Sequence, residues 1–484
     1  MGIKRLKTAE LMIRGDPLAE LPDGILLEII SLLPLREAVR TSILSKSWRS
    51  IWTCHSDLKF DSLNVLGSTA QLRPSTCINE SSRHLERCKF VQRVDQIMHQ
   101  RCKGLKINSL TVHCQLGKEF SSHIDHWISC AAMREVEIID LNLSESCSYM
   151  ENCACSTHLE HYKFDCGILA APGRKSYLKH LKLNSCTFSA PLSSNCLNSL
   201  ISLELRRVCI SDEMLKKLLS NCLVLETLTL HLCQDLVNLD FGGPNLRLKF
   251  LRIQDCLRLN KLEISSENII RLEYTGPLVS FSFKHVPNLV EAYLCFTQKN
   301  RLYGVTYALT RLASELPQLE KLNLHSILSM NVLELPDSGP AFTNVKELVL
   351  SIYPFHDEDR LNWIAYILKA FPSLQKLQLN LFSPSFVKEP KEIERLLPEC
   401  PHQHLTELEI NGFYGNKHEV ELLKYLLENS VALKVLAVTP CQKVFRGFNN
   451  WVCEKESARY ISRRKSISNW LHELVPTTVS LDVW

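Results

Sequence analysis

The sequence has little glycine, little proline, little net charge and no long apolar run. It contains only 16 Gly and 20 Pro among 484 residues, so we expect no long low-complexity region. The 56 basic and 52 acidic residues leave a formal charge of +4, whereas nucleic-acid-binding proteins usually carry a strongly basic surface. No stretch reaches the roughly 18 uninterrupted apolar residues of a membrane-spanning helix. We therefore expect neither nucleic acid nor membrane as a partner.

Signals of secretion and of catalysis are also missing. The opening MGIKRLKTAELMIRGD has no apolar segment of the signal-peptide kind, and Leu6 stands where a myristoylation pattern requires Ser or Thr. We interpret the 20 Cys as free thiols in a soluble protein of the cytoplasm or nucleus, used as small apolar side chains. GxxxxGK[ST], GxSxG, HExxH, CxxC and a GxGxxG after a strand do not occur, so we expect a protein that is not an enzyme and has no catalytic residue.

One stretch collects side chains that could bind zinc. It is CSYMENCACSTHLEHYKFDC, with Cys147, Cys153, Cys155, His158, His161 and Cys166. Because their spacing fits no common zinc pattern, we expect no bound metal, and nothing else in the sequence indicates a cofactor.

Residues 21–52, LPDGILLEIISLLPLREAVRTSILSKSWRSIW, carry more apolar side chains than so short a segment needs. Pro22 and Asp23 suit the first turn of a helix. That helix would place one apolar stripe at Ile25 and Ile29 and further apolar groups on its other faces, and two short helices should follow. The surplus apolar surface indicates either a partner-binding patch or packing against the rest of the chain.

The same segment resembles the plant F-box, through LPD at 21–23, LLP at 32–34 and TSILSKSWRSIW from Thr41. An F-box docks on the small adaptor subunit of an SCF ubiquitin ligase. The resemblance implies that adaptor binding uses Leu21, Pro22, Ile25, Ile29, Leu32, Leu33, Pro34 and Val39. Gly24 stands where the family usually has an acidic residue, and this predicts a weaker first helical turn.

An LxxLxL pattern recurs through the middle of the chain. It begins at Leu178, Leu200, Leu225 and Leu248, at intervals of 22, 25 and 23 residues, and continues to Leu433. These intervals match leucine-rich repeats. The two leucines of LxL share one face of a short strand, and stretches such as SDEMLKKLLSN predict helices that cover the back. Stacked units of this kind build a parallel sheet over one continuous core.

The residues between the leucines should face the opposite, concave side of the sheet. They are polar and of mixed charge, so we predict that this face binds a target protein, with a solvated face that binds nothing as the alternative. The candidate target-binding residues are His180, Lys182, Glu204, Arg206, Thr229, His231, Arg252 and Gln254.

The segment HLTELEINGFYGNKHEVELLKYLLENSVALKVLAV, residues 404–438, predicts a strand, a glycine-containing turn, an amphipathic helix and a second strand. It resembles the FBD module found at the end of many plant F-box/leucine-rich-repeat proteins. Because a repeat array needs a terminal cap, we expect this module to provide one.

We therefore predict an α/β fold in which a three-helix F-box precedes a leucine-rich-repeat solenoid of parallel strands with helices on the convex side. The expected ranges are a flexible tail at 1–15, the F-box at 16–61, a helical linker at 62–100, the repeats at 101–400, and an FBD-like cap with a terminal helix at 401–484.

The resemblances imply a substrate-recognition subunit of an SCF-type E3 ubiquitin ligase. It would reach cullin and RING subunits through the adaptor and hold an unknown target protein on the repeats. The alternatives are an F-box scaffold outside a ligase, a small-ligand sensor that uses the concave face, and an enzyme whose residues lie in the loops.

Overall fold

The structure is a computed structural model, and the chain forms two compact units, residues 1–209 and 210–484. The residues it describes are 21–33, 35–41, 48, 52–67, 80–100, 106–144, 160–169, 176–189, 195–243, 246–297, 307–325, 341–352, 362–382, 400–445, 447, 450–453 and 458–483.

The first unit begins with short helices and continues into a parallel sheet. Its main elements are α1 (Asp23–Leu32), α2 (Leu35–Arg40), β1 (Asp57–Asp61), α4 (Ser62–Leu66), α5 (Glu80–Gln100), β2 (Ser109–His113), α6 (Ser121–Ala132), β3 (Ile138–Asn142), β4 (Tyr162–Asp165), β5 (His180–Asn184), β6 (Cys186–Ser189) and β7 (Ser202–Arg206). Strands β1, β2, β3, β5 and β7 pair in this order, all parallel, and β4 pairs with β6 in a small second sheet.

The second unit contains ten strands of one parallel sheet. They are β8 (Thr227–His231), β10 (Phe250–Gln254), β12 (Arg271–Gly276), β14 (Glu291–Phe296), β15 (Lys321–His325), β16 (Glu347–Ile352), β17 (Lys376–Leu381), β18 (Glu407–Asn411), β19 (Val435–Thr439) and β22 (Ser480–Val483). Each is paired in parallel with the next.

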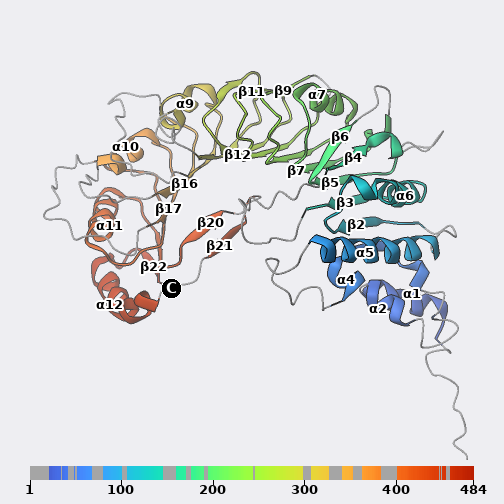
Figure 1. Cartoon of the computed structure of the whole chain (residues 1–484). Helices are drawn as coiled ribbons and strands as arrows, with labels where there is room; N and C mark the ends of the chain where they lie inside the picture. The colour runs from blue at the N-terminus through green and yellow to red at the C-terminus, as the bar shows by residue number, and fades with distance from the viewer. Residues whose placement is uncertain are drawn as a thin grey trace, which may run out of the picture. The chain divides into compact units, whose positions relative to one another are not determined.

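Helices and two smaller sheets complete the second unit. The helices are α7 (Asp212–Asn221), α9 (Leu312–Glu315), α10 (Asn362–Ala370), α11 (Lys417–Asn429) and α12 (Ala458–Leu474). The smaller sheets are a parallel one of β9 (Asn238–Gly242), β11 (Lys261–Ser265) and β13 (Ser280–Phe283), and an antiparallel hairpin of β20 (Lys443–Phe445) and β21 (Trp451–Cys453). Figure 1 shows α7, α9, α10 and α11 on the outer side of the row of strands and the hairpin on the inner side.

The leucine pattern explains the core. In β8 the two leucines of the motif, Leu228 and Leu230, are completely buried, and the corresponding leucines of the other strands are at most a few per cent exposed. These leucines lie on one side of the sheet and the residues between them on the other, because side chains alternate along a strand. The predicted α/β class, with short helices followed by a large parallel sheet, is confirmed.

The sheet is longer at both ends than the LxxLxL pattern indicates. The strand β1, which lies within the range expected for the F-box, pairs with β2. At the other end, β18, α11 and β19 adopt the predicted order, but the sheet continues beyond β19 to β22, which follows α12. The FBD-like segment thus extends the sheet by paired strands, and the last strand comes from the terminal residues.

The turns after several strands share one backbone conformation. Ser185, Leu232 and Asp255 each follow a strand directly and have positive φ angles between 53° and 60°. Gly412 has the same place after β18, with φ of 76°, and a Cβ there would lie 2.2 Å from the carbonyl oxygen of Leu381. Only glycine avoids this collision, because it lacks a Cβ.

Candidate functional sites: an exposed apolar stripe and a polar sheet face

Helix α1 divides its apolar side chains between a buried and an exposed side. Leu26 and Ile30 are at most 1% exposed and pack with Ala38, Trp48 and Trp52 in one cluster. Ile25 and Leu32 are seven residues apart and so lie on one side of the helix, where they are 46% and 80% exposed, and Leu27 is 41% exposed on another side. We call Ile25 and Leu32 the exposed stripe. Large exposed apolar side chains gathered on one short helix are typical of a protein-binding surface.

The helices that carry the stripe are held against the rest of the first unit. Ile97 of α5 packs against the buried cluster. Downstream of the helices, His55 is buried, and its Nε2 lies 2.9 Å from the carbonyl oxygen of Leu33 at the end of α1. The backbone N–H of Asp57 donates to His55 Nδ1 at 3.2 Å, so Nε2 carries the proton and donates to Leu33. The imidazole thereby fixes the end of α1 to the start of β1.

The structure places the predicted adaptor-binding residues in two groups. Pro22, Ile25 and Leu32 are exposed. Leu21, Ile29, Leu33 and Val39 are half-buried and pack against the cluster; Pro34 lies outside the described residues. The prediction did not include Leu27, which is also exposed. Leu27 lies two positions from Ile25, so the two side chains do not share one side of the helix.

In the first unit, the predicted target-binding residues lie on β5 and β7, opposite the leucines. His180 and Lys182 belong to β5, and Glu204 and Arg206 to β7. Lys182 is paired in register with Glu204, and their side chains form an ion pair at 3.2 Å. His180 and Arg206 are half-buried at the two ends of these strands. The structure thus brings the four residues onto one small area of the sheet.

In the second unit, the other four predicted residues lie on β8 and β10. Thr229 is 6% and His231 is 9% exposed, so neither offers much surface to a partner. Arg252 lies 3.5 Å from Glu273 of β12 and donates a hydrogen bond to Gln254 at 2.9 Å. These side chains therefore already have partners within the chain. We call this side of the main sheet of the second unit, opposite the leucines, its polar face.

Along one edge of the polar face the charges alternate from strand to strand. The first residues of six consecutive strands are aligned in register and read Arg271, Glu291, Lys321, Glu347, Lys376 and Glu407. Lys321 and Glu347 are 2.5 Å apart and Lys376 and Glu407 are 3.1 Å apart, while Arg271 is paired with Glu291. Opposite charges directly across a strand pair stabilise a sheet. We call this row the charge ladder; because it neutralises itself, it presents no patch of one sign to a partner.

A second polar row lies deeper on β16, β17 and β18. Asn380 Nδ2 donates to Ser351 Oγ at 3.0 Å, and Asn411 Nδ2 donates to Asn380 Oδ1 at 2.8 Å. All three side chains are at most 2% exposed. Buried polar groups that satisfy one another in this way stabilise one particular arrangement of strands.

The hairpin of β20 and β21 contacts the polar face. The ring of Phe445 stacks on that of Tyr293 in β14 with centroids 3.9 Å apart. Lys443 forms an ion pair with Glu409 in β18. Burial opposes ionisation of Glu409, but hydrogen bonds from Lys443 and Asn411 outweigh it and lower the pKa of the carboxyl group. This hairpin was not predicted from the sequence.

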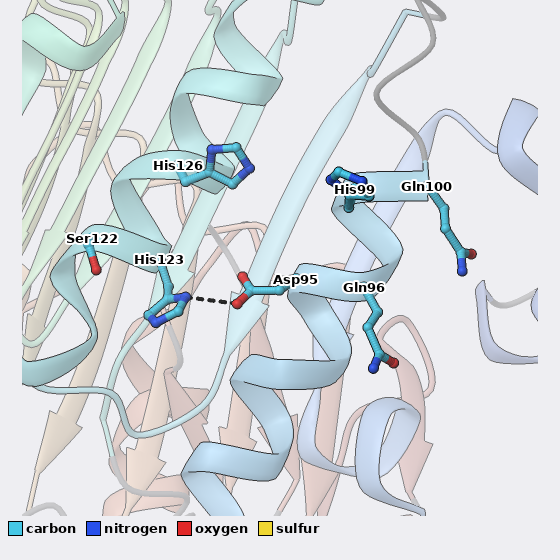
Figure 2. Close-up of a pocket in the computed structure, with 7 residues that line it drawn as sticks. All are labelled: Asp95, Gln96, His99, Gln100, Ser122, His123 and His126. Atoms are coloured by element: carbon cyan, nitrogen blue, oxygen red, sulfur yellow. Dashed lines mark ion pairs between the residues drawn. The ribbon is translucent and has the colours of Figure 1, made fainter.

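A groove of about 600 Å³ lies between α5 and α6 in the first unit, and three histidines line it (Figure 2). Asp95 reaches from α5 to His123 of α6, with 2.8 Å between Oδ2 and Nδ1. The other carboxylate oxygen accepts a hydrogen bond from Trp127 Nε1 at 2.7 Å. Both oxygens of Asp95 are thus engaged in linking the two helices. The groove accordingly has the character of a helix–helix contact and not of an acid–base site.

The residues that the structure describes contain no group of three His, Cys, Asp or Glu side chains placed to hold a metal ion. Of the six zinc-capable residues weighed in the sequence, only His161 and Cys166 are described; the remaining four lie outside the described ranges. Among the described helices, none has both the length and the apolar character needed to cross a bilayer.

Comparison with known proteins identifies two domains. The family described as "At1g61320/AtMIF1, LRR domain" matches residues 97–484, and the F-box domain family matches residues 18–59. The first match covers most of the chain and includes β22 but not β1.

Similar whole proteins are named for an F-box together with an FBD module, leucine-rich repeats or both. The FBD-associated F-box protein At5g50270 of Arabidopsis thaliana is 27% identical over 446 residues, covering 88% of this chain and 97% of the relative. The F-box/FBD/LRR-repeat protein At4g13965 of the same plant is 26% identical over 451 residues, covering 89% and 92%. The F-box/LRR-repeat protein At3g03360, also from Arabidopsis thaliana, is 27% identical over 376 residues, covering 76% and 70%. The chain therefore belongs to the plant F-box/leucine-rich-repeat proteins and shares features with those that carry an FBD module.

Proposed function

We propose that this chain is the substrate-recognition subunit of an SCF-type ubiquitin ligase. The F-box would dock the adaptor, and the repeats would hold a target protein. The observation that carries the proposal is the exposed stripe on α1, since it lies in an F-box domain and leaves Leu32 at 80% exposure. Burying side chains of this size stabilises a complex by about 1.5–3 kcal/mol each.

The proposed mechanism is proximity. The chain itself would carry no catalytic residue; the ligase's E2 carries ubiquitin, and a RING subunit recruits the E2. Holding the target beside that E2 raises the effective concentration of the target's lysines. Within the first unit, His55 and Ile97 hold α1 against the start of β1 and against α5, which supports this role. A target held on the strands of this unit would then be kept in place relative to the adaptor.

The proposal is tested by titrating a recombinant plant SCF adaptor against the full chain. The variant Ile25→Asp/Leu32→Asp places two charges in the exposed stripe without touching the buried cluster. We expect it to weaken adaptor binding at least 100-fold. The matched control is Leu85→Asp, which changes a leucine of α5 that is 54% exposed and lies outside the stripe. The control should bind the adaptor as tightly as the unchanged chain.

Two outcomes contradict the proposal. If the unchanged, folded chain does not bind the adaptor, the exposed stripe has another purpose. If the double variant binds as tightly as the control, the adaptor uses a different surface. Adaptor binding without any target turnover in a reconstituted ligase would favour the scaffold alternative.

A further inference from the structure

The hairpin directs one of its two faces at the polar face of the sheet. Its register pairs Lys443 with Cys453 and Phe445 with Trp451, so Lys443 and Phe445 lie on the same side of β20. Val444 is paired with Val452 on the other side, and Val452 is 42% exposed. Lys443 and Phe445 thus contact the sheet as two side chains of a strand bound from another molecule would.

Among the described residues, three contacts join the hairpin to the sheet, and they lie on three well-separated strands. Phe445 stacks on Tyr293 of β14, and Lys443 is paired with Glu409 of β18. The third contact is at Gly447, which has φ of 93° and lies against the guanidinium group of Arg252 in β10. A Cβ on Gly447 would be 2.4 Å from the guanidinium carbon. The hairpin therefore bridges from β10 to β18 on the inner side of the strands (Figure 1).

Side chains attach the hairpin to the sheet, and its strands do not continue the backbone pairing of the sheet. Its two strands have three residues each and pair only with each other among the described strands. An isolated two-stranded hairpin is barely stable in water. Its order therefore depends on the contacts with Tyr293, Glu409 and Arg252, and another segment that offers the same chemistry can compete for them.

The chemistry that Tyr293 and Glu409 recognise is specific. Tyr293 is 8% exposed and presents an aromatic surface, which favours a second ring at stacking distance. Glu409 receives a hydrogen bond from the ammonium group of Lys443, and such charge-assisted bonds are about twice as strong as neutral ones. Together they recognise a lysine and an aromatic residue two positions apart on one extended strand.

We propose that Tyr293 and Glu409 form a target-binding site for an extended segment of the type Lys-x-aromatic, and that the hairpin of β20 and β21 occupies this site until a target displaces it. The proposal deepens the proposed function, on which it rests for the existence of a target.

The experiment uses the full chain and a fluorescent synthetic peptide with the sequence of residues 442–452, QKVFRGFNNWV. The variant Gly447→Ala should loosen the hairpin, because an L side chain is strained at this φ, and the added Cβ would also displace the guanidinium group of Arg252 from its place against the turn. It leaves Tyr293 and Glu409 unchanged. We expect the peptide to bind this variant at least 10-fold more tightly than the unchanged chain. The matched control, Val452→Ala, alters the exposed face of the hairpin and should bind like the unchanged chain.

Two further variants test the site itself in the Gly447→Ala background. Glu409→Gln keeps the shape but removes the charge, and Tyr293→Leu keeps an apolar side chain but removes the ring. Each should weaken peptide binding at least 10-fold. Amide hydrogen exchange, measured in parallel, should show faster exchange at β20 and β21 in Gly447→Ala, with β10, β14 and β18 still protected.

Three results would overturn the proposal. The first is equal peptide affinity for Gly447→Ala and the unchanged chain although the hairpin exchanges faster. The second is binding that neither Glu409→Gln nor Tyr293→Leu weakens. The third is amide hydrogen exchange in β20 and β21 that, in every variant, occurs only when the whole second unit unfolds. Adaptor binding is tested with variants of α1 and does not depend on any of these three results. The proposed function and this proposal can therefore fail separately.

Discussion

Helix α1 and the polar face of the second unit differ in which side chains they bury. On α1, apolar groups remain in solvent, with Leu32 at 80% exposure. On the polar face, charged and amide groups are buried, with Glu273 at 4% and Asn380 at 1%. Each arrangement is unfavourable unless something compensates for it, because apolar surface prefers burial and polar groups prefer water or hydrogen bonds.

The compensation differs between the two regions. The polar face finds it within the chain, through the charge ladder, the amide row and the hairpin. For the exposed stripe, the described residues supply no cover, so a second protein is the natural source. A surface that the sequence pattern predicts to bind a partner can therefore already have its polar groups paired within the chain. The exposed fraction of the side chains in the folded chain distinguishes such a surface from one that is free to bind.

The largest expected effect separates the two sides of α1. Leu26→Ala removes a completely buried side chain from the cluster and should lower the free energy of unfolding of the F-box helices by about 2–5 kcal/mol. Leu32→Ala removes an exposed one and should change it by less than about 0.5 kcal/mol. Urea denaturation followed by circular dichroism measures both. Similar losses for the two variants would mean that Leu32 is packed and that the exposed stripe does not exist.

The next effect compares a glycine from each region. Gly412→Ala places a Cβ against the carbonyl oxygen of Leu381 at positive φ, and it should destabilise the second unit by more than about 2 kcal/mol. Gly24→Ala lies in α1 with no atom within 4 Å of the added Cβ, and it should stabilise the helix by up to about 1 kcal/mol. Calorimetric melting of both variants is the measurement. A tolerated Gly412→Ala would show that the turn after β18 can adopt another conformation.

A smaller effect is expected in the charge ladder. Lys321→Glu puts a third negative charge in line with Glu291 and Glu347, and it should destabilise the second unit by about 1 kcal/mol at low salt. Added salt should reduce the loss, since these side chains are partly exposed. The control is Lys217→Glu on the exposed side of α7, where the same charge reversal should have little effect. A salt-independent loss would contradict an electrostatic ladder.

The smallest effect concerns the pH dependence of the hairpin contact. The pKa of Glu409 lies below its ordinary value of 4.5, because hydrogen bonds from Lys443 and Asn411 outweigh burial, with a further contribution from Lys376. The resulting stabilisation is fully present above about pH 4.5 and is lost as the pH falls through the lowered pKa. Carboxyl NMR of Glu409 measures this pKa, and Lys443→Ala should raise it. An unchanged pKa in that variant would place Lys443 away from Glu409.

Regular features of the fold could be predicted from the sequence, because they follow from local periodicity. LxxLxL determines which side chains of a strand enter the core, and the alternation of Leu228 and Leu230 with polar neighbours is visible without a structure. The start of helix α11 can also be recognised in the sequence, because Asn416 and Glu419 form a capping box. The apolar excess of residues 21–52 likewise indicated a candidate docking helix.

The remaining features depend on contacts between distant residues. The hairpin strands β20 and β21 are three residues long, too short for a period to be visible, and their partners Tyr293 and Glu409 lie far away along the chain. β1 and β22 are short strands defined by pairing with a neighbour. Leu26 and Leu27 are adjacent and chemically identical, so only packing decides that one is buried and the other exposed.

One measurement tests the central contrast most directly: hydroxyl-radical footprinting of the full chain, alone and with the SCF adaptor. In the free chain, Ile25 and Leu32 should be modified readily and Tyr293 poorly, as their exposures predict. The adaptor should protect Ile25 and Leu32 and leave the modification of Tyr293 unchanged. Protection of Leu32 in the free chain, or adaptor-dependent protection of Tyr293 without change at Leu32, would contradict the account.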